Sequence, residues 1–309
     1  MSSTIDLQRP ILITGSTGQV GGELVRLLAP LGPIHAPTRA ELDLSDPASI
    51  RTIVQELKPR WIVNPAAYTA VDRAETEPDV AFAINATAPG VLGEEAAKIG
   101  AAVLHFSTDY VFTGTGTEPY AEDAPTGPLG IYGASKLAGE QALAASGAAH
   151  LIVRTSWVYG ATGKNFLLTV LRVAREREQM SIVDDQHGAL TWSRELARMA
   201  VTVLDKAPDA DAARAFAGIY HAAAQGETTW FGFAQEVLRL RRLAEPATHF
   251  AELIPIPTSA YPTPAKRPAN SRLDSRKLKA TFGFEFTPWQ QALEEVLAGI
   301  PLPDATPAS

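Results

Sequence analysis

The chain has 309 residues and a mass of 32.9 kDa, which is enough for one large domain or for a large domain with a smaller partner. Hydrophobic residues at 46% and charged residues at 20% are ordinary for a folded chain and exclude wholesale disorder. A net charge of −7 argues against a nucleic-acid binder, which needs basic stripes. The absence of cysteine excludes disulfides, thiolate metal sites and a cysteine nucleophile.

Two further features of the sequence bear on where the protein works. The first ten residues lack the apolar core of a secretory signal. No stretch reaches the roughly 18 uninterrupted apolar residues of a membrane helix. We therefore expect a soluble, cytoplasmic protein whose partners include neither membranes nor nucleic acids.

Short apolar runs alternate with longer amphipathic stretches in the first half of the chain. The predicted strands are 10–15, 34–38, 61–64, 101–107 and 151–156, and the predicted helices are 18–30, 46–58, 85–98 and 132–145. Asp46 followed by Pro47 is typical of a helix start. Strict alternation of strand and helix indicates βαβ crossovers, and so an α/β fold with a Rossmann-like, doubly wound parallel sheet.

The second half is less regular. It predicts a helix at about 165–178, a strand at 180–185, a helix at 193–206 and a strand at 218–223. The Ala/Asp-rich stretch 207–218 is expected to be a surface connection. The proline-rich stretch 254–271 is expected to be an ordered loop without regular structure, which either lines the site or simply connects.

These elements suggest a division into domains. We expect residues 1–155 to form a dinucleotide-binding domain, which about 192–224 rejoin through the late strand. Residues 156–191 and 225–309 then form a smaller, interleaved C-terminal substrate domain.

A glycine-rich loop follows the first predicted strand. Gly15, Gly18 and Gly21 are three residues apart in GSTGQVG. Glycine backbone lets a pyrophosphate approach closely, and a helix N-terminus offers free N–H groups. Between a strand and a helix, the triplet predicts a dinucleotide site, the alternative being a plain tight turn.

The residues after the second strand bear on the choice of cofactor. A site that prefers NADH usually places an acidic residue there, but this chain has Thr38 and Arg39. A hydroxyl and a guanidinium suit a 2′-phosphate, so NADPH is favoured and NADH stays possible. The alternative is an arginine on a solvated turn. Asp43 and Leu44 would then flank the adenine.

Three residues form the candidate catalytic group. Tyr132 and Lys136 are four residues apart in YGASK, and hence on one face of a helix. A nearby ammonium favours the phenolate, which brings a phenol closer to acid–base work at neutral pH. Thr108, at the end of the preceding strand, can hydrogen-bond the reacting oxygen. The alternatives are an amphipathic surface pair and an ordinary strand-end hydroxyl.

With these motifs the chain resembles the extended short-chain dehydrogenases/reductases. Within them, five blocks spread between Gly15 and Leu273 are very similar to the dTDP-4-dehydrorhamnose reductase family: STDYVFTG, PTGPLGIYGASKLAGE, RTSWVYG, DQHGALT and AYPTPAKRPANSRL. The resemblance implies hydride transfer from NADPH to C4 of dTDP-4-dehydro-L-rhamnose, which gives dTDP-L-rhamnose. Tyr132 would then protonate the C4 alkoxide, Lys136 would hold the nicotinamide ribose, and Thr108 would hold the substrate oxygen.

The resemblance also implies binding residues. Besides Tyr132, Lys136 and the residues after the second strand, those expected at the cofactor are Gly15, Thr17, Gly18, Gln19, Val20, Gly21, Ala66, Ala67 and Tyr68. Those expected at the nucleotide sugar, besides Thr108, are Val71, Asp72, Asp109, Tyr110, Trp157, Asn165, Gln186, His187 and Arg267. Trp157 could equally be a core residue. Asn85 is expected to steady the strand that carries Thr108.

Departures from the family pattern bear on metals and assembly. Leu190 stands where the family usually has proline. Some relatives dimerise through Mg²⁺ held by glutamates. Glu23 matches one such position, but the other holds Arg194, so a role for Mg²⁺ is doubtful and a monomer or weak homodimer is expected. The six histidines do not lie at metal-ligand spacing, so we expect no catalytic metal, and His105 is expected to be a satisfied core residue.

Two other functions remain open from the sequence. A related nucleotide-sugar epimerase or dehydratase would share the glycine loop and the Tyr–Lys pair. A non-catalytic nucleotide-binding regulatory subunit would share the fold, although the intact Thr108, Tyr132 and Lys136 argue against lost catalysis.

Overall fold

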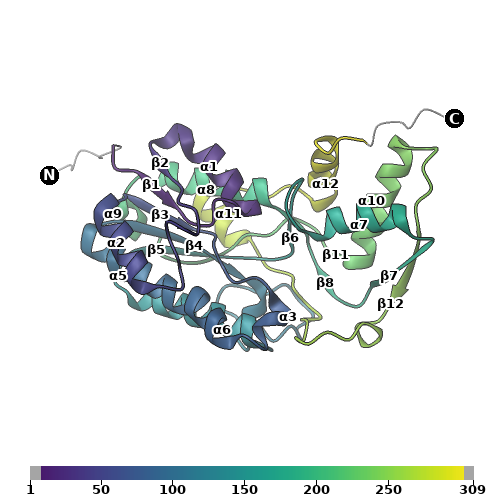
Figure 1. The fold of residues 1–309 in the computed structure, drawn as a ribbon, viewed down its shortest axis with the longest axis horizontal. Coiled ribbons are helices and arrows are strands. Elements are labelled where there is room, and N and C mark those ends of the chain that lie inside the picture. Colours follow the sequence, from purple (N-terminus) through teal and green to yellow (C-terminus); the bar gives the residue numbers. More distant parts are fainter. Residues whose placement is uncertain (1–7, 303–309) are drawn as a thin grey trace.

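A six-stranded parallel sheet forms the centre of the larger lobe (Figure 1) in this computed structural model, which describes residues 8–302. From one edge to the other its strands are β2 (Ile34–His35), β1 (Ile11–Ile13), β3 (Trp61–Asn64), β4 (Ala102–Thr108), β5 (Ala149–Thr155) and β10 (Gly218–His221). After β2 the chain crosses over β1 to form β3, so the strand order reverses between β1 and β3. Such a reversal leaves a crevice at the carboxyl ends of the strands. The predicted Rossmann-like sheet is confirmed.

Helices cover both faces of this sheet. One face carries α1 (Gln19–Leu28), α8 (Ser193–Lys206), α9 (Ala210–Arg214) and α11 (Arg276–Phe282), and the other carries α2 (Pro47–Leu57), α5 (Ala88–Ile99) and α6 (Ile131–Ala145). Alternate residues of each strand enter opposite cores, so Ile11 and Ile13 face α1 while Leu12 faces α2. This period of two follows from strand geometry.

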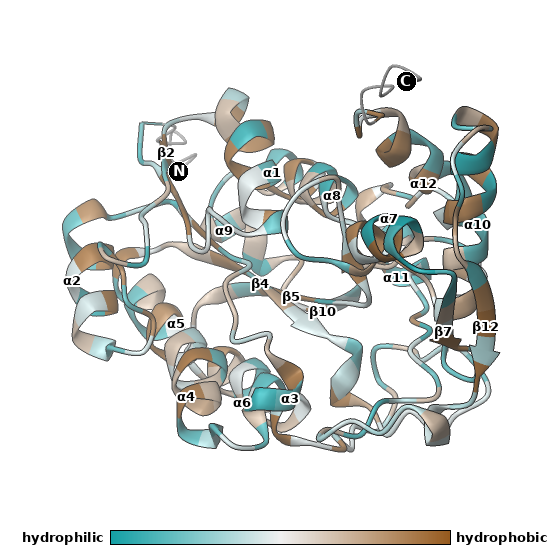
Figure 2. Ribbon diagram, turned by 45° about the vertical axis from the view of Figure 1, so that its right-hand side comes forward, coloured by the Kyte–Doolittle hydropathy of each residue, from teal (hydrophilic) through white to brown (hydrophobic). Residues whose placement is uncertain are grey.

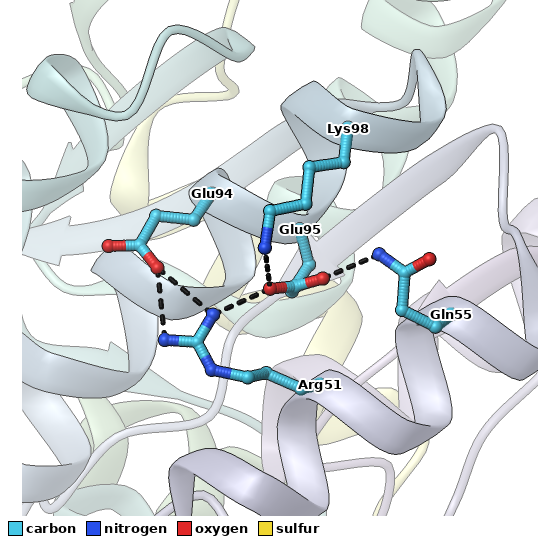
Figure 3. Close-up of polar contacts among 5 residues, drawn as sticks. All are labelled: Arg51, Gln55, Glu94, Glu95 and Lys98. Atoms are coloured by element: carbon cyan, nitrogen blue, oxygen red, sulfur yellow. Dashed lines mark hydrogen bonds and ion pairs between the residues drawn. The ribbon is translucent and has the colours of Figure 1, made fainter.

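A polar cluster ties α2 to α5 at the rim of the sheet (Figure 3). Glu95 is 1% exposed, and its carboxylate accepts hydrogen bonds from Arg51 and Lys98, both at 2.6 Å, and from Gln55. Arg51 also pairs with the exposed Glu94 at 3.1 Å. A buried carboxylate is tolerated only when it is paired in this way.

The helical segment before α5 begins earlier than predicted. It starts with α3 (Val71–Ala74) and α4 (Pro78–Phe82), and a π-helical turn (Ala83–Thr87) then leads directly into α5. Proline at the first turn of α4 fits a helix start. Asn85 therefore lies inside a π turn, a distortion that frequently marks functional sites.

The smaller lobe has its own hydrophobic core. It is built from α7 (Phe166–Glu176), α10 (Trp230–Ala244), α12 (Trp289–Ala298) and the parallel pair β7 (Gln179–Val183) and β12 (Glu252–Ile256). The short pairs are β6 (Val158–Tyr159) with β9 (Thr191–Trp192), and β8 (His187–Gly188) with β11 (Thr228–Thr229). Among residues 8–302, single 3₁₀ turns lie at Ala29–Leu31 and Asp109–Val111 in the larger lobe and at Thr258–Ala260 after β12. Apolar and polar residues are mixed along α7 and α10 (Figure 2), as in helices with one apolar side.

Two expectations about loops were wrong in part. The Ala/Asp-rich stretch contains α9, which begins because Asp209 caps the N–H of Ala212 at 2.9 Å and which buries Ala210 and Ala213. The proline-rich stretch begins inside β12. Pro255 is tolerated there because β12 is paired on one side only, so a missing N–H costs no ladder bond.

Between residues 8 and 302, none of the helices has both the length and the apolar character needed to cross a membrane.

Candidate active site

The glycine loop joins β1 to α1 and packs against the segment that follows β3. Gly15 has φ +57°, and a Cβ built on it would lie 3.0 Å from the Cβ of Ala66. A Cβ on Gly21 would lie 2.0 Å from the carbonyl oxygen of Gly15, which no side chain can occupy. Gly18 is the N-cap of α1 and provides no side-chain cap, so the first N–H groups of the helix are available to an anion.

A pocket of about 210 Å³ lies beside this loop. Eight residues predicted at the cofactor line it: Gly15, Thr17, Thr38, Arg39, Asp43, Leu44, Ala66 and Ala67. Its other lining residues, which the sequence did not single out, are Thr14, Ser16, Pro37, Leu42 and Ile84. Ser16 stands inside the glycine motif and so had a local signal, but Ile84 comes from the distant π turn and had none. Gly18, Gln19, Val20, Gly21 and Tyr68 lie outside the lining, the first four around the start of α1.

Thr38 is already engaged by a carboxylate. Glu41 accepts hydrogen bonds from the backbone N–H of Thr38 at 2.7 Å and from its hydroxyl at 2.9 Å. These bonds lower the pKa of Glu41, so this exposed group is negatively charged at neutral pH. The predicted 2′-phosphate region thus contains an acidic side chain, Glu41, beside Arg39. The sequence did not single out Glu41, although it lies only two residues after Arg39.

The three predicted catalytic residues meet at the carboxyl edge of the sheet. Thr108 ends β4, while Tyr132 and Lys136 lie on the first two turns of α6. Burial raises the pKa of Tyr132 to about 12, and a hydrogen bond with Thr108 opposes that rise. The expected lowering of the Tyr132 pKa by Lys136 is not found: burial has the largest effect on this pKa, and the effect that lowers it comes from Thr108. The phenol is therefore protonated at neutral pH.

Lys136 is 1% exposed and tightly held. Its Nζ donates to the carbonyl oxygen of Phe106 at 2.6 Å and lies 3.2 Å from Nε2 of His105. Burial lowers the pKa of Lys136 to about 8. The ammonium therefore sits near its titration point at neutral to mildly alkaline pH.

Asn85 supports α6 rather than the strand that ends in Thr108, contrary to expectation. Its Oδ1 accepts from the N–H of Tyr68 at 2.8 Å, and its Nδ2 donates to the carbonyl of Tyr68 and to the hydroxyl of Ser135, both at 3.1 Å. Ser135 in turn donates to the carbonyl oxygen of Tyr132 at 2.9 Å. Asn85 thus fixes the segment after β3 to the helical turn that carries Tyr132.

Two neighbours of Thr108 complete the centre. The ring of Tyr110 packs edge-on against that of Tyr132, with centroids 5.4 Å apart. Asp109 is 3% exposed and accepts from the Thr108 hydroxyl at 3.0 Å. Burial raises the pKa of Asp109 to about 6.

A second pocket, of about 410 Å³, lies between the lobes and is lined by Tyr110. Four residues predicted at the nucleotide sugar line it: Asp72, Tyr110, Gln186 and Arg267. The remaining lining residues are Phe166, Thr169, Met180, Ser181, Ile182, Val183, Trp230, Thr258, Tyr261 and Thr263. Tyr261 and Thr263 belong to the AYPTPAKRPANSRL block, whereas the others come from segments without a recognised motif. Two larger pockets, of about 580 and 860 Å³, contain none of the predicted site residues.

The other predicted sugar contacts lie around this pocket without lining it. Trp157 stacks on Trp230, a lining residue, with centroids 3.9 Å apart, and both pack against the core of the smaller lobe. Trp157 also has φ +48°. Asn165 caps α7 by accepting from Leu168 at 3.0 Å and donates to Gln19 at 2.9 Å. Val71 begins α3. The side chain of His187 is exposed, and its backbone donates to the carbonyl of Ala269 and accepts from the N–H of Ser271.

Glu23 and Arg194 form an ion pair at 3.1 Å. Burial acts to raise the pKa of Glu23, but hydrogen bonds from Arg194 and Arg26 outweigh it and lower the pKa. Leu190 is buried in the core of the smaller lobe. Within residues 8–302, acidic and histidine side chains do not gather in groups of three or more that could hold a metal ion.

Comparison with known proteins agrees with this geometry. The family model for the RmlD substrate binding domain matches residues 9–301. Proteins called dTDP-4-dehydrorhamnose reductase from Burkholderia thailandensis and Escherichia coli are 48% and 45% identical over 92% and 93% of this chain and 96% of their own length. The crystal structure of dTDP-4-dehydrorhamnose reductase from Bacillus anthracis in complex with NADP superposes with a TM-score of 0.87 at 32% identity, covering 94% of this chain and 99% of that one. The chain therefore belongs to the RmlD family of the dTDP-4-dehydrorhamnose reductases.

Proposed function

We propose that the chain is an NADPH-dependent oxidoreductase that reduces the C4 keto group of dTDP-4-dehydro-L-rhamnose to the hydroxyl of dTDP-L-rhamnose. It would thus catalyse the last step of dTDP-rhamnose synthesis. Family membership supports the reaction. The observation that carries the proposal is that Tyr132 lies beside Thr108 at the end of β4, while Lys136, one turn later on α6, bonds the carbonyl oxygen of Phe106 on the same strand. Tyr110, which packs against Tyr132, lines the second pocket.

The residues around the first pocket fit a dinucleotide. The glycine loop has no room for a side chain where its backbone turns, and the N-terminus of α1 presents uncapped N–H groups. We assign the pyrophosphate to this loop, the adenosine to the segment with Arg39 and Asp43, and the nicotinamide ribose to Tyr132 and Lys136. The bound structure of the Bacillus anthracis relative supports NADPH. When bound, NADPH supplies the hydride that is transferred to C4.

The chain's own residues handle the proton. Tyr132, protonated because burial raises its pKa to about 12, donates its proton to the oxygen at C4 as that oxygen becomes an alkoxide. Thr108 donates a hydrogen bond to the same oxygen and so fixes the carbonyl. The Lys136 ammonium stabilises the phenolate that is left. One proton and one hydride convert the ketone to the alcohol, and solvent reprotonates Tyr132.

The second pocket fits the nucleotide sugar. It offers the Tyr110 phenol, the Gln186 amide and the Arg267 guanidinium beside apolar walls, including Trp230. We propose that Arg267 binds the diphosphate, because charge-assisted pairs with arginine are strong. Val71, Asp109, Trp157, Asn165 and His187 remain predictions as sugar contacts.

We also propose the division of labour between the lobes. Residues 1–155, rejoined by about 192–224, would bind the cofactor, while 156–191 and 225–309 would bind the substrate. The Glu23–Arg194 pair leaves the Glu23 carboxylate neutralised by an arginine, which supports a monomer or weak homodimer that does not depend on Mg²⁺.

One assay tests the proposed function. Purified protein is mixed with NADPH and enzymatically prepared dTDP-4-dehydro-L-rhamnose, and the loss of nicotinamide absorbance is followed with product analysis. We expect one dTDP-L-rhamnose for each NADPH consumed. Protein that binds NADPH but leaves it unconsumed with this ketone would refute the reductase function, and release of an epimer or a dehydrated sugar would support the alternative enzymes.

A further inference from the structure

A buried row of polar side chains runs beneath the catalytic lysine. His105, on β4, is fully buried and lies with Nε2 3.2 Å from Lys136 Nζ and Nδ1 2.9 Å from Nδ2 of Asn64. Asn64, at the end of β3, accepts from the hydroxyl of Thr14 at 2.6 Å. Thr14 follows β1 and lines the first pocket. The row thus crosses three adjacent strands and links Lys136 to that pocket.

The surroundings of His105 make its polarity notable. On the same face of the sheet its neighbours Val103 and Ile152 are fully or almost fully buried apolar residues of the core. A buried polar ring costs free energy unless it is hydrogen-bonded. An apolar side chain would fill this position without that cost, so the imidazole is best explained by what it bonds.

The hydrogen-bonding capacity of each group restricts the arrangement. An ammonium has three N–H donors and no acceptor. At Lys136 one donates to the carbonyl of Phe106, and a second can donate to His105 only if Nε2 is unprotonated. The imidazole proton then lies on Nδ1 and needs an acceptor, which the amide oxygen of Asn64 supplies after a half turn of the amide.

The amide orientation in the structure matches the other protonation state. With Nδ2 of Asn64 facing Nδ1, Nε2 carries the proton and Lys136 accepts it as an uncharged amine. The Asn64 amide and the Thr14 hydroxyl can each donate or accept. The row therefore satisfies either charge state of Lys136 without moving the backbone.

We propose that His105, oriented by Asn64, is a positioning residue that holds the Lys136 ammonium and supports its charged state during reduction. The inference rests on the proposed function, because it concerns the proton chemistry of that reaction. The carboxylate of Glu140, on the same helix, also acts on Lys136, and it is itself paired with the buried Arg154 of β5 at 2.6 Å. Tyr132 lies one turn earlier on that helix. His105 is thus the ring that faces Lys136 from the sheet.

Two amide variants of His105 separate its two contacts. The amide of His105→Gln reaches roughly where Nε2 stood and can still accept from Lys136, whereas that of His105→Asn reaches only where Nδ1 stood. Val103→Ala serves as the matched control, because it opens a cavity on the same face of β4 without removing a polar contact. Each variant is assayed for kcat across pH, for NADPH affinity and for melting temperature.

We expect kcat of His105→Asn to fall by about 10- to 100-fold, the size expected for one hydrogen bond to a charged group. The alkaline limb of its pH profile should move to lower pH, because an ammonium without its acceptor loses its proton more readily. His105→Gln should keep kcat within about threefold of wild type, since its acceptor is retained. Val103→Ala should have a lower melting temperature than wild type, and the alkaline limb of its pH profile of kcat should stay where it is in wild type.

Two outcomes would overturn the inference, namely an unchanged kcat and pH limb in His105→Asn below its melting temperature, or equal losses in both amide variants. An inactive wild-type enzyme would refute the proposed function instead. Nuclear magnetic resonance of the ring nitrogens then tests the row without substrate. The imidazole proton of His105 should lie on Nδ1 while Lys136 is charged and should move to Nε2 as Lys136 loses its proton. In Lys136→Met this movement with pH should be absent. A His105 tautomer that stays the same while Lys136 titrates would refute the inference.

Discussion

Asp72 and Arg267 are 195 positions apart in the chain, and they form an ion pair of 2.7 Å on the wall of the second pocket. The pair joins α3 of the larger lobe to the proline-rich segment of the smaller one. Asp72 uses only one nitrogen of the guanidinium, and Nη1 of Arg267 is buried with no hydrogen-bond partner among residues 8–302. A diphosphate would offer that nitrogen an acceptor.

The first prediction concerns this pair. Arg267→Met should raise the KM for the nucleotide sugar by about 10- to 100-fold, because a charge-assisted hydrogen bond to the diphosphate is lost, while kcat changes much less. Asp72→Asn should leave KM unchanged or lower it, since it removes a carboxylate that competes for Arg267. Steady-state kinetics measure both. A rise in KM as large in Asp72→Asn as in Arg267→Met would mean that the pair matters only for structure.

The second prediction concerns the proton donor. Tyr132→Phe should lower kcat by about 10²- to 10⁴-fold, the range for loss of a general acid, and should bind NADPH almost as wild type does. Tyr220→Phe is the matched control, because it also loses one phenol hydroxyl, which bonds the carbonyl oxygen of Phe216 in the core of the larger lobe. Near-wild-type turnover in Tyr132→Phe would mean that another group delivers the proton.

The third prediction concerns the choice of cofactor. Arg39→Ala should weaken NADPH binding by about tenfold, or about 1.4 kcal/mol, because the 2′-phosphate loses its cation, and should leave NADH nearly unaffected. Glu41→Gln should act in the opposite direction and strengthen NADPH binding, since the carboxylate that holds Thr38 repels a phosphate. Fluorescence titration gives the two dissociation constants. Equal losses for both cofactors in Arg39→Ala would remove this residue from the 2′-phosphate site.

The fourth prediction concerns stability and pH. Burial acts to raise the pKa of Glu95, but hydrogen bonds from Lys98, Gln55 and Arg51 outweigh it and lower the pKa. A carboxyl with a depressed pKa stabilises the folded state above its unfolded pKa, and loses that effect as pH falls through the folded value. Glu95→Gln should therefore cost about 1–2 kcal/mol at neutral pH, and progressively less in acid.

Glu94→Gln is the control for this fourth prediction. Glu94 is about half exposed, and among residues 8–302 its carboxylate pairs with Arg51 alone, so its loss should cost less than about 1 kcal/mol. Urea unfolding at several pH values measures both variants. If the free energy of unfolding that Glu95→Gln loses stays the same below the pKa of the carboxyl, packing and not charge is responsible for the loss.

Local patterns were enough to predict most of the larger lobe. The alternation of apolar strands with amphipathic helices predicted the parallel sheet, because each element buries one face and the connections allow little else. The cap at Asp46 and the helix at 193–206 are local signals, and both are found where expected. The second half of the chain was predicted less well, since the two-residue strands of the smaller lobe and the short helix α9 of the larger lobe are stabilised by partners distant in sequence.

The sequence by itself determined the fold class, the family and the chemical identity of the candidate catalytic group, because a glycine loop and a Tyr–Lys helix are short motifs. Only the tertiary structure decided what surrounds them. Burial raises the pKa of Tyr132, Glu41 occupies Thr38, and His105 lies against Lys136. Each depends on which side chains the packing brings together and on how much water it excludes. The composition alone excludes thiol chemistry, because the chain has no cysteine. The burial and the hydrogen-bond partners of the Tyr132 phenol and the Lys136 ammonium follow only from the folded chain.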